Sequence, residues 1–209
     1  MKNILTGANL STECIRNPIE WMYYQSDSCQ IRDIHKKFGS LTLNTFPLTS
    51  ILWHKIWLPY FKGIKVHRPL NLVDYIKEDA VKLLVKNYGW KPYPQKHFES
   101  RFTRFYESYW LPKRFGYDVR KVQYSSLILT EQMTRDDALE ALSRPSYDVE
   151  TIAHDFEFIA TKLGITTGEL QTFMELPKKT YKDYRSQHSL YNIGARAMKA
   201  LGLEVGGKR

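Results

Sequence analysis

Cysteine is scarce in this chain, and repeats, low-complexity tracts and long apolar runs are absent from it. The 209 residues include two cysteines, Cys14 and Cys29, which are too few for a disulfide framework and wrongly spaced for a zinc knuckle. A reducing compartment is the simpler interpretation, so we expect a cytoplasmic protein. No stretch reaches the roughly 18 uninterrupted apolar residues of a membrane-spanning helix. The sequence therefore predicts no membrane span.

The most apolar stretch is residues 46–64, FPLTSILWHKIWLPYFKGI, which is interrupted by His54, Lys55, Pro59 and Lys62. Two interpretations of this stretch are open. It could form an amphipathic segment at a membrane interface, with its aromatic residues at the boundary. We favour the second interpretation, a buried helix of a globular domain.

The composition is that of an ordinary globular protein, with 43% hydrophobic and 25% charged residues. Basic residues outnumber acidic ones by 31 to 22, which gives a net charge of +9. A basic chain can bind nucleic acid, anionic lipid or a polyanionic small molecule such as a nucleotide sugar. The charge alone does not choose among these three classes.

The first residues have the pattern of a strand, a tight turn and the start of a helix. An apolar pair, Ile4-Leu5, is followed by Thr6-Gly7-Ala8-Asn9, and Ser11 to Glu13 come next. Many α/β proteins build a phosphate site in this way. Residues 41–46 and 64–71 are further strand candidates. Parallel sheets are normally covered on both faces, but Ile4-Leu5 would lack neighbours on at least one side. We therefore expect exposed apolar surface there.

Helical patterns dominate the rest of the chain. A helix is predicted over 74–88, with Asp74 as N-cap and Gly89 as its stop. Two capping boxes, Thr134 with Asp137 and Thr166 with Glu169, predict later helix starts. The predicted fold class is thus α/β, with few parallel strands followed by a mostly helical region. We place a partial α/β nucleotide-binding domain in residues 1–90 and a helical C-terminal region in 91–209.

The densest polar cluster lies in residues 96–128. On an ideal helix, His97, Arg101, Arg104 and Ser108 form one column, because they are spaced at i, i+4, i+7 and i+11. Guanidinium and hydroxyl groups in such columns suit an anionic, hydroxyl-rich ligand. From spacing alone, a solvated helix whose charges only maintain solubility explains the pattern at least as well.

Two other patterns predict no site. The last residues, GLEVGGKR at 202–209, nearly match a P-loop, but Arg209 stands where Ser or Thr is needed. We interpret them as a terminus without function. The histidines lack the spacing of metal ligands, so no metal site is predicted.

Four stretches resemble a known family: LTGANLSTE, RPLNLVDYIKEDAVKLLVKNYGW, KHFESRFTRFYESYWLPKRFGYDVRKVQYSSLI and QMTRDDALEAL. The family is the N-acetyl sugar amidotransferases of lipopolysaccharide O-antigen biosynthesis, in the PP-loop ATP pyrophosphatase superfamily. The similarity runs from residue 3 to about residue 185. It implies the C-terminal portion of a PP-loop (adenine nucleotide alpha hydrolase-like) fold.

The resemblance also implies a reaction. ATP activates the N-acetyl group of a nucleotide sugar, ammonia attacks it, AMP leaves, and an acetamidino group results. The complete enzyme would use ATP and Mg²⁺. A glutaminase subunit and a synthase-like subunit would supply the ammonia.

The same resemblance implies roles for individual residues. Either His97 or Glu99 would take the proton lost by the attacking ammonia. Four residues would line the nucleotide pocket: Thr6, Gly7, Asn9 and Glu13. Five would contact the sugar or its phosphates: Arg104, Arg120, Lys121, Ser125 and Ser126.

The chain departs from the superfamily in one important respect. The Ser-Gly-Gly-x-Asp-Ser loop, which holds the pyrophosphate in PP-loop enzymes, does not occur in this sequence. We therefore expect either a truncated or split product, or a chain that works beside a separate N-terminal PP-loop chain. In both cases the chain alone would be inactive and would not bind ATP productively.

Two alternatives to the enzyme hypothesis remain open. The chain could be a non-catalytic scaffold that docks a partner subunit. It could also be a basic helical module that binds a polyanion, although it lacks known nucleic-acid-binding motifs and no nucleic acid partner is predicted. The residues of such a module would be Arg101, Arg104, Lys113, Arg114, Arg120 and Lys121.

Overall fold

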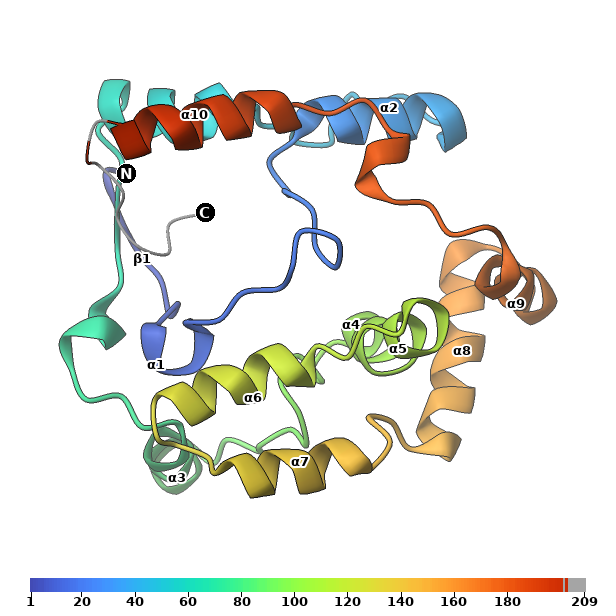
Figure 1. The fold of residues 1–209 in the computed structure, drawn as a ribbon. Helices are drawn as coiled ribbons and strands as arrows, with labels where there is room; N and C mark the ends of the chain where they lie inside the picture. Colours follow the sequence, from blue (N-terminus) through green and yellow to red (C-terminus); the bar gives the residue numbers. More distant parts are fainter. Residues whose placement is uncertain (201, 203–209) are drawn as a thin grey trace. The chain divides into compact units, whose positions relative to one another are not determined.

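The structure is a computed structural model that describes residues 1–200 and residue 202; it is mostly helical, with one small parallel sheet (Figure 1). The chain forms two compact units. The first contains residues 1–7, 18–69 and the chain from 179 onward, and the second contains residues 8–17 and 70–178. This grouping by compactness does not follow a single break near residue 90. The predicted division into a nucleotide-binding part and a C-terminal region stays a prediction.

The sheet belongs to the first unit and consists of β1 (Asn3–Leu5) and β2 (Lys65–His67), paired in parallel with Ile4 opposite Val66. All six strand residues are exposed, which confirms the expected exposed apolar surface. The strand predicted over 41–46 is wrong, because these residues form bends and irregular chain. Alternating side chains do not make a strand when no neighbouring strand is available for pairing.

The helices of the first unit are α2 (Ser28–Phe38), η1 (Trp53–Phe61), η4 (Tyr181–Asp183) and α10 (His188–Ala200). A short helix η2 (Pro69–Leu72) follows β2 in the sequence.

The centre of the first unit is the buried carboxylate of Asp27, which is 0% exposed. One of its oxygens accepts hydrogen bonds from the amides of Cys29 and Gln30 and thereby caps α2. The other accepts from the Tyr23 hydroxyl at 2.8 Å and from the Gln187 amide at 2.6 Å. Asp27 therefore joins the start of α2 to the segment that precedes α10.

Tyrosine rings pack around this carboxylate. Tyr24 stacks on Tyr191 of α10, with ring centroids 3.7 Å apart, and Tyr23 stacks on Tyr181 at 4.8 Å. Burial, together with the carboxylate of Asp27, raises the pKa of the Tyr23 hydroxyl above its ordinary value. The hydroxyl thus stays protonated and remains a hydrogen-bond donor to Asp27.

The second unit is built from helices alone. Three of them, α4 (Arg101–Phe105), η3 (Tyr106–Trp110) and α5 (Leu111–Phe115), follow one another without interruption. The others are α1 (Leu10–Glu13), α3 (Lys77–Tyr88), α6 (Arg120–Leu129), α7 (Arg135–Ser143), α8 (Val149–Leu163) and α9 (Thr167–Glu175).

Most of the predicted helix ends are confirmed. Both capping boxes are present, at Thr134 for α7 and at Thr166 for α9. Gly89 ends α3 in the left-handed conformation, with φ of 62°. The predicted N-cap at Asp74 is wrong, because α3 begins at Lys77. The Lys77 amide donates instead to the Gln132 side chain at 2.9 Å, so a residue distant in the sequence caps this helix.

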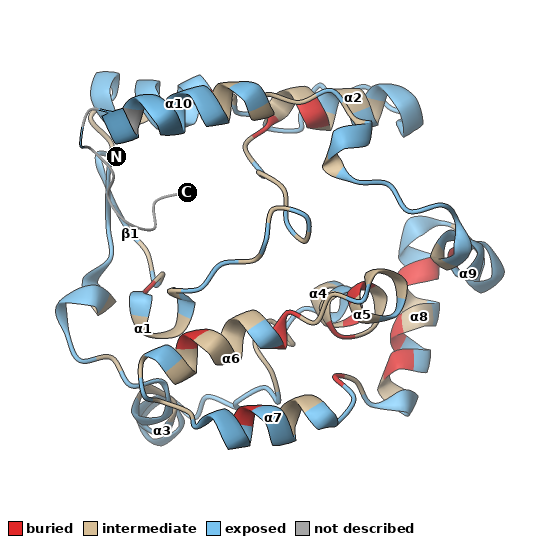
Figure 2. Cartoon of the chain, viewed as in Figure 1, coloured by how far each residue is buried: buried red, intermediate tan, exposed pale blue. Residues whose placement is uncertain are grey.

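The core of the second unit lies between the helical run that begins with α4 and helices α8 and α9, where buried positions gather in Figure 2. Phe105 meets Phe156 of α8 edge to face, with centroids 5.7 Å apart. Helix α8 supplies three of the core positions, Ile152, Ile159 and Ala160. The fully buried members of the core are Phe105, Ile152, Ile159, Ala160 and Leu170.

Candidate functional site

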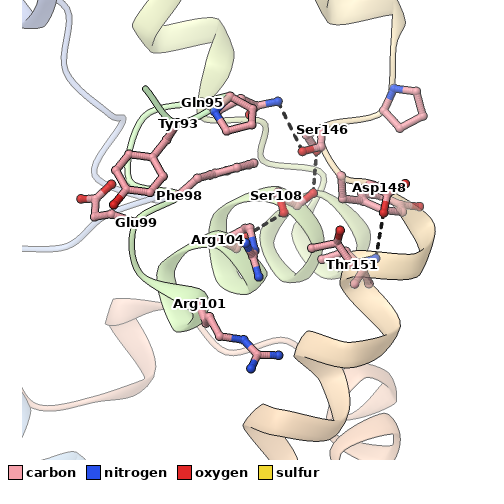
Figure 3. A pocket seen from close by; sticks show the side chains of 14 residues that line it. Tyr93, Gln95, Phe98, Glu99, Arg101, Arg104, Ser108, Ser146, Asp148 and Thr151 are labelled. Atoms are coloured by element: carbon pink, nitrogen blue, oxygen red, sulfur yellow. Dashed lines mark hydrogen bonds between the residues drawn. The ribbon is translucent and has the colours of Figure 1, made fainter. Parts of the chain in front are cut away.

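A cavity of about 640 Å³ opens in the second unit, within the roughly 300–1,000 Å³ typical of small-molecule sites. Three segments line it: the turn at 93–99, the helix at 101–108 and the segment at 145–152. Figure 3 shows Tyr93 and Glu99 at one end of this pocket and Asp148 and Thr151 at the other. The helical spacing therefore brings Arg101, Arg104 and Ser108 together, as predicted.

The two arginines of the pocket are held by one buried carboxylate. Nε of Arg104 donates to Oδ2 of Asp155 at 2.7 Å, and its Nη2 donates to Oδ1 at 2.7 Å. Nε of Arg101 donates to the same Oδ1 at 2.9 Å. Asp155 on α8 is 0% exposed. The two guanidinium groups are thus positioned and largely neutralised by a carboxylate behind the pocket wall.

This arrangement shifts the pKa values of Asp155 and Arg104 in opposite directions. Burial alone would raise the pKa of Asp155, but the guanidinium groups of Arg104 and Arg101 outweigh burial and hold the pKa below its ordinary value. The pKa of Arg104 is raised in turn, chiefly by its hydrogen bonds to Asp155. The ion pair therefore stays charged at neutral pH.

Pro112 of α5 lies four residues after the pocket residue Ser108. Pro112 has no amide hydrogen, so it cannot donate to the carbonyl oxygen of Ser108 four residues earlier. That carbonyl oxygen accepts a hydrogen bond from the Ser146 hydroxyl at 2.5 Å. The Ser146 carbonyl oxygen accepts from the Gln95 side-chain amide at 3.4 Å. Pro112 thereby leaves an acceptor through which the 145–152 segment is attached to the helix.

The pocket wall is mixed rather than cationic. Tyr93, Phe98 and Tyr147 contribute aromatic rings, while Glu99 and Asp148 contribute carboxylates. The carboxylate of Asp148 caps α8 by accepting from the Thr151 amide at 2.8 Å, a hydrogen bond that lowers its pKa. Together with Asp155 behind the wall, these carboxylates outnumber the two arginines by three to two, so the wall has no excess positive charge. The pocket therefore suits a hydroxyl-rich or amide-bearing ligand better than a multiply charged one.

The two residues predicted as catalytic are separated by the structure. Glu99 lines the pocket. His97 does not, and its Nδ1 lies 3.1 Å from both carboxylate oxygens of Glu107. The predicted helical column fails at His97, because α4 begins only after Ser100, whose hydroxyl accepts from the Thr103 amide. His97 instead lies in a turn with φ of 69°.

Of the five residues predicted to contact substrate, Arg104 alone lines this pocket. Arg120 is buried, and all three guanidinium nitrogens donate, to Asp118 and to the carbonyl oxygens of Ala141 and Arg144. Its surroundings are those of a structural residue.

The remaining three residues lie on α6. The Ser126 hydroxyl is buried and accepts from the Ile15 amide at 3.0 Å, so it attaches the α1 segment to α6. The Ser125 hydroxyl donates to the Lys121 carbonyl oxygen at 2.6 Å. Lys121 is exposed. Contact of these residues with a substrate stays a prediction.

The residues predicted to bind the nucleotide divide between the two units. Thr6 and Gly7 belong to the first unit. In the second unit the Asn9 side chain accepts from the Thr12 amide at 2.8 Å and caps α1, which is only four residues long. The Glu13 carboxylate pairs with Lys96 at 2.5 Å. Side chains committed to a helix cap and to a lysine do not by themselves fit ATP with Mg²⁺.

Most of the basic residues of the polyanion hypothesis are also committed within the chain. Arg101 and Arg104 bind Asp155, and Arg120 is buried. The guanidinium group of Arg114 donates to the carbonyl oxygens of Met174 and Leu176. These hydrogen bonds fix the ends of α5 and α9 and do not favour a polyanion surface.

Nowhere in residues 1–200 do three His, Cys, Asp or Glu side chains gather as a metal ion would require. No helix in the described part of the chain has the length and apolarity to cross a membrane. The P-loop-like end at 202–209 lies, apart from residue 202, outside the described residues.

Sequence reasoning missed several pocket residues, among them Gln95, Ser146, Asp148 and Thr151. Two signals were available. Asp148 and Thr151 precede and begin an apolar helical stripe, which is the pattern of an N-cap. Asp155 interrupts that stripe with a carboxylate, and a buried carboxylate needs a cationic partner.

Comparison with known families gives a match to a stretch that includes ten of the fourteen pocket-lining residues. Residues 99–198 match the model of the family described as LPS biosynthesis protein WbpG-like, C-terminal domain. Comparisons with curated proteins and with solved structures give no significant match. The match supports a relationship between this chain and the C-terminal domain of a lipopolysaccharide biosynthesis family.

Proposed function

We propose that this chain is the C-terminal part of an ATP-dependent amidotransferase of lipopolysaccharide O-antigen biosynthesis, and that it binds the N-acetyl sugar. The proposal rests on the overlap between the family match and the pocket. Ten of the fourteen pocket-lining residues, from Glu99 to Ile152, fall within the matched stretch 99–198. The reaction proposed for the complete enzyme is conversion of the N-acetyl group of a nucleotide sugar to an acetamidino group.

The composition of the pocket supports a sugar as its ligand. Aromatic rings such as Tyr93 and Tyr147 offer flat apolar faces, while the Gln95 amide and the Glu99 carboxylate offer hydrogen-bonding groups. A hydroxyl-rich ring with an amide substituent presents both kinds of surface. Because the wall has no excess positive charge, it disfavours placing the diphosphate of a nucleotide sugar deep in this pocket.

Of the two predicted catalytic residues, Glu99 is the better placed. Its carboxylate belongs to the pocket wall, whereas His97 pairs with Glu107. A carboxylate beside the sugar could accept the proton that ammonia loses on attack. We therefore assign the base to Glu99.

ATP and Mg²⁺ are proposed for the complete enzyme, with a PP-loop chain or domain as the part that holds them. No step of the ATP chemistry is assigned to Thr6, Gly7, Asn9 or Glu13. The glutaminase and synthase-like subunits remain the proposed source of ammonia. These partners follow from the family resemblance.

The proposal is tested with UDP-N-acetylglucosamine as probe. Titration calorimetry on the full chain should detect binding, and Tyr93→Ala should weaken it by about fivefold or more, because one stacking face is lost. Tyr88→Ala is the matched control, since Tyr88 is an exposed tyrosine of α3 outside the pocket. Equal binding by the wild type and Tyr93→Ala, or no binding of the probe, would contradict a sugar site here.

A kinetic experiment tests the role of Glu99 in the assembled enzyme. Glu99→Gln keeps the size of the side chain and removes its basicity. It should lower kcat by about 10²-fold or more while changing the KM for the sugar little. Glu157→Gln, on the exposed side of α8, should leave both constants unchanged. A loss confined to KM would identify Glu99 as a binding residue only.

A further inference from the structure

The helix η1 of the first unit is apolar but exposed, which corrects the favoured prediction of a buried helix over 46–64. Trp53, Trp57 and Phe61 stack in a row, with ring centroids 5.7 and 4.8 Å apart. Trp53 and Trp57 are 41% and 39% exposed, and Phe61 is 68% exposed. No residue of η1 is buried. An apolar face of this kind marks an interaction surface.

The chain around η1 is free of negative charge. Between Asp33 and Asp74 the sequence contains no Asp or Glu, while it contains six Lys and Arg residues. Lys62, Lys65 and Arg68 follow the aromatic row directly and are exposed. A surface that is apolar, aromatic and basic at once is complementary to a partner that is apolar and anionic.

We propose that η1 and the basic residues after it dock on an anionic lipid bilayer. Tryptophan rings favour the boundary between headgroups and acyl chains, and lysine and arginine are attracted to anionic headgroups. At nine residues, η1 is far too short to span a bilayer and would lie in its surface. This surface lies in the first unit and the pocket in the second, so the proposal is independent of the proposed sugar site.

Vesicle sedimentation of the full chain tests the proposal. One set of vesicles is pure phosphatidylcholine, and the other contains equal parts of phosphatidylcholine and phosphatidylglycerol. The chain should sediment with the anionic vesicles, much less with the neutral ones, and less at high salt, because salt screens the attraction to the headgroups.

Substitutions separate the contribution of the aromatic rings to vesicle binding from that of the basic residues. The double variant W53A/W57A should reduce the partition coefficient by about tenfold or more, since it removes the apolar anchor. Lys62→Gln and Lys65→Gln should each reduce it by about fivefold on anionic vesicles only. Tyr88→Ala and Lys86→Gln, which alter exposed residues of α3, are matched controls and should bind like the wild type.

Three outcomes would overturn the proposal. The wild type could fail to bind either kind of vesicle. W53A/W57A could bind as well as the wild type while circular dichroism shows it to be folded. The wild type could form an oligomer that W53A/W57A does not form, with no vesicle binding by either, which would make the face a contact between copies of the chain. In each case, the effect of Tyr93→Ala on sugar binding could still be as proposed, because that experiment tests a separate site.

Discussion

Arg104 and Asp155 form a two-point ion pair, in which Nε and Nη2 of the guanidinium group donate to different oxygens of one carboxylate, each at 2.7 Å. Asp155 is fully buried, whereas the Arg104 side chain is 25% exposed. The pair thus joins α8 to the helix that carries the pocket arginines, and it fixes the Arg104 guanidinium group at the pocket wall.

Removal of this carboxylate should destabilise the fold. Asp155→Asn leaves the guanidinium groups of Arg101 and Arg104 without a counter-charge, and we expect the free energy of unfolding to fall by about 2–4 kcal/mol. Urea denaturation measures the change. Glu140→Gln is the control, because its ion pair with Arg144 is exposed, at 68% and 73%, and should contribute less than about 1 kcal/mol. Equal losses in the two variants would contradict the role of Asp155.

The same pair predicts a pH dependence. The pKa of Asp155 is lower in the folded chain than its ordinary value of 3.8. Its stabilisation is therefore fully present above pH 3.8 and is lost as the pH falls through the folded value. The stability difference between the wild type and Asp155→Asn should shrink below pH 3.8 in urea titrations. A difference that already shrinks above pH 5 would contradict the lowered pKa.

Pro112 and Ser146 should be energetically coupled through the carbonyl oxygen of Ser108. Ser146→Ala leaves this buried acceptor without a donor and should lower the free energy of unfolding by about 1–2 kcal/mol. In a Pro112→Ala background the new amide can donate to the same oxygen, so the loss should be smaller by about 0.5–1 kcal/mol. A double-mutant cycle in urea measures this coupling. Ser143→Ala, an exposed serine of α7, should change stability little.

The left-handed backbone at His97 predicts that glycine is more stable than alanine at this position, the reverse of the order inside a helix. Both His97→Ala and His97→Gly remove the contact with Glu107, but glycine alone adopts φ of 69° without a steric penalty. The glycine variant should be more stable by about 1 kcal/mol. At Lys82, inside α3, the order should reverse, with alanine more stable by about 1 kcal/mol. The same order at both positions would contradict a strained backbone at His97.

Local signals account for the parts of the fold that the sequence predicts well. The capping boxes at Thr134 and Thr166 and the glycine stop at Gly89 each depend on a few neighbouring residues. Ser100 carried a signal of the same kind, since serine is a favoured N-cap residue, and in the structure its hydroxyl accepts from the Thr103 amide. This signal would have placed His97 outside the helix.

The pocket depends on contacts between residues that are distant in the sequence. Sequence patterns did not predict these contacts. Asp155 meets Arg101 and Arg104 across more than fifty positions. The exposure of η1 was equally hidden, because an apolar helix has the same sequence pattern whether or not another element covers it. Its pairing of aromatic residues with basic ones was visible and pointed to the interfacial alternative.

The contact of Asp27 with Gln187 has a consequence for synthesis. A ribosome makes Asp27 about 160 residues before Gln187, and until then this carboxylate lacks one of its donors. During that time the early segment stays incomplete, whereas the second unit, made of residues 8–17 and 70–178, needs no residue later than 178. Translation order and folding order should therefore differ, with the N-terminal segment among the last to reach its native state.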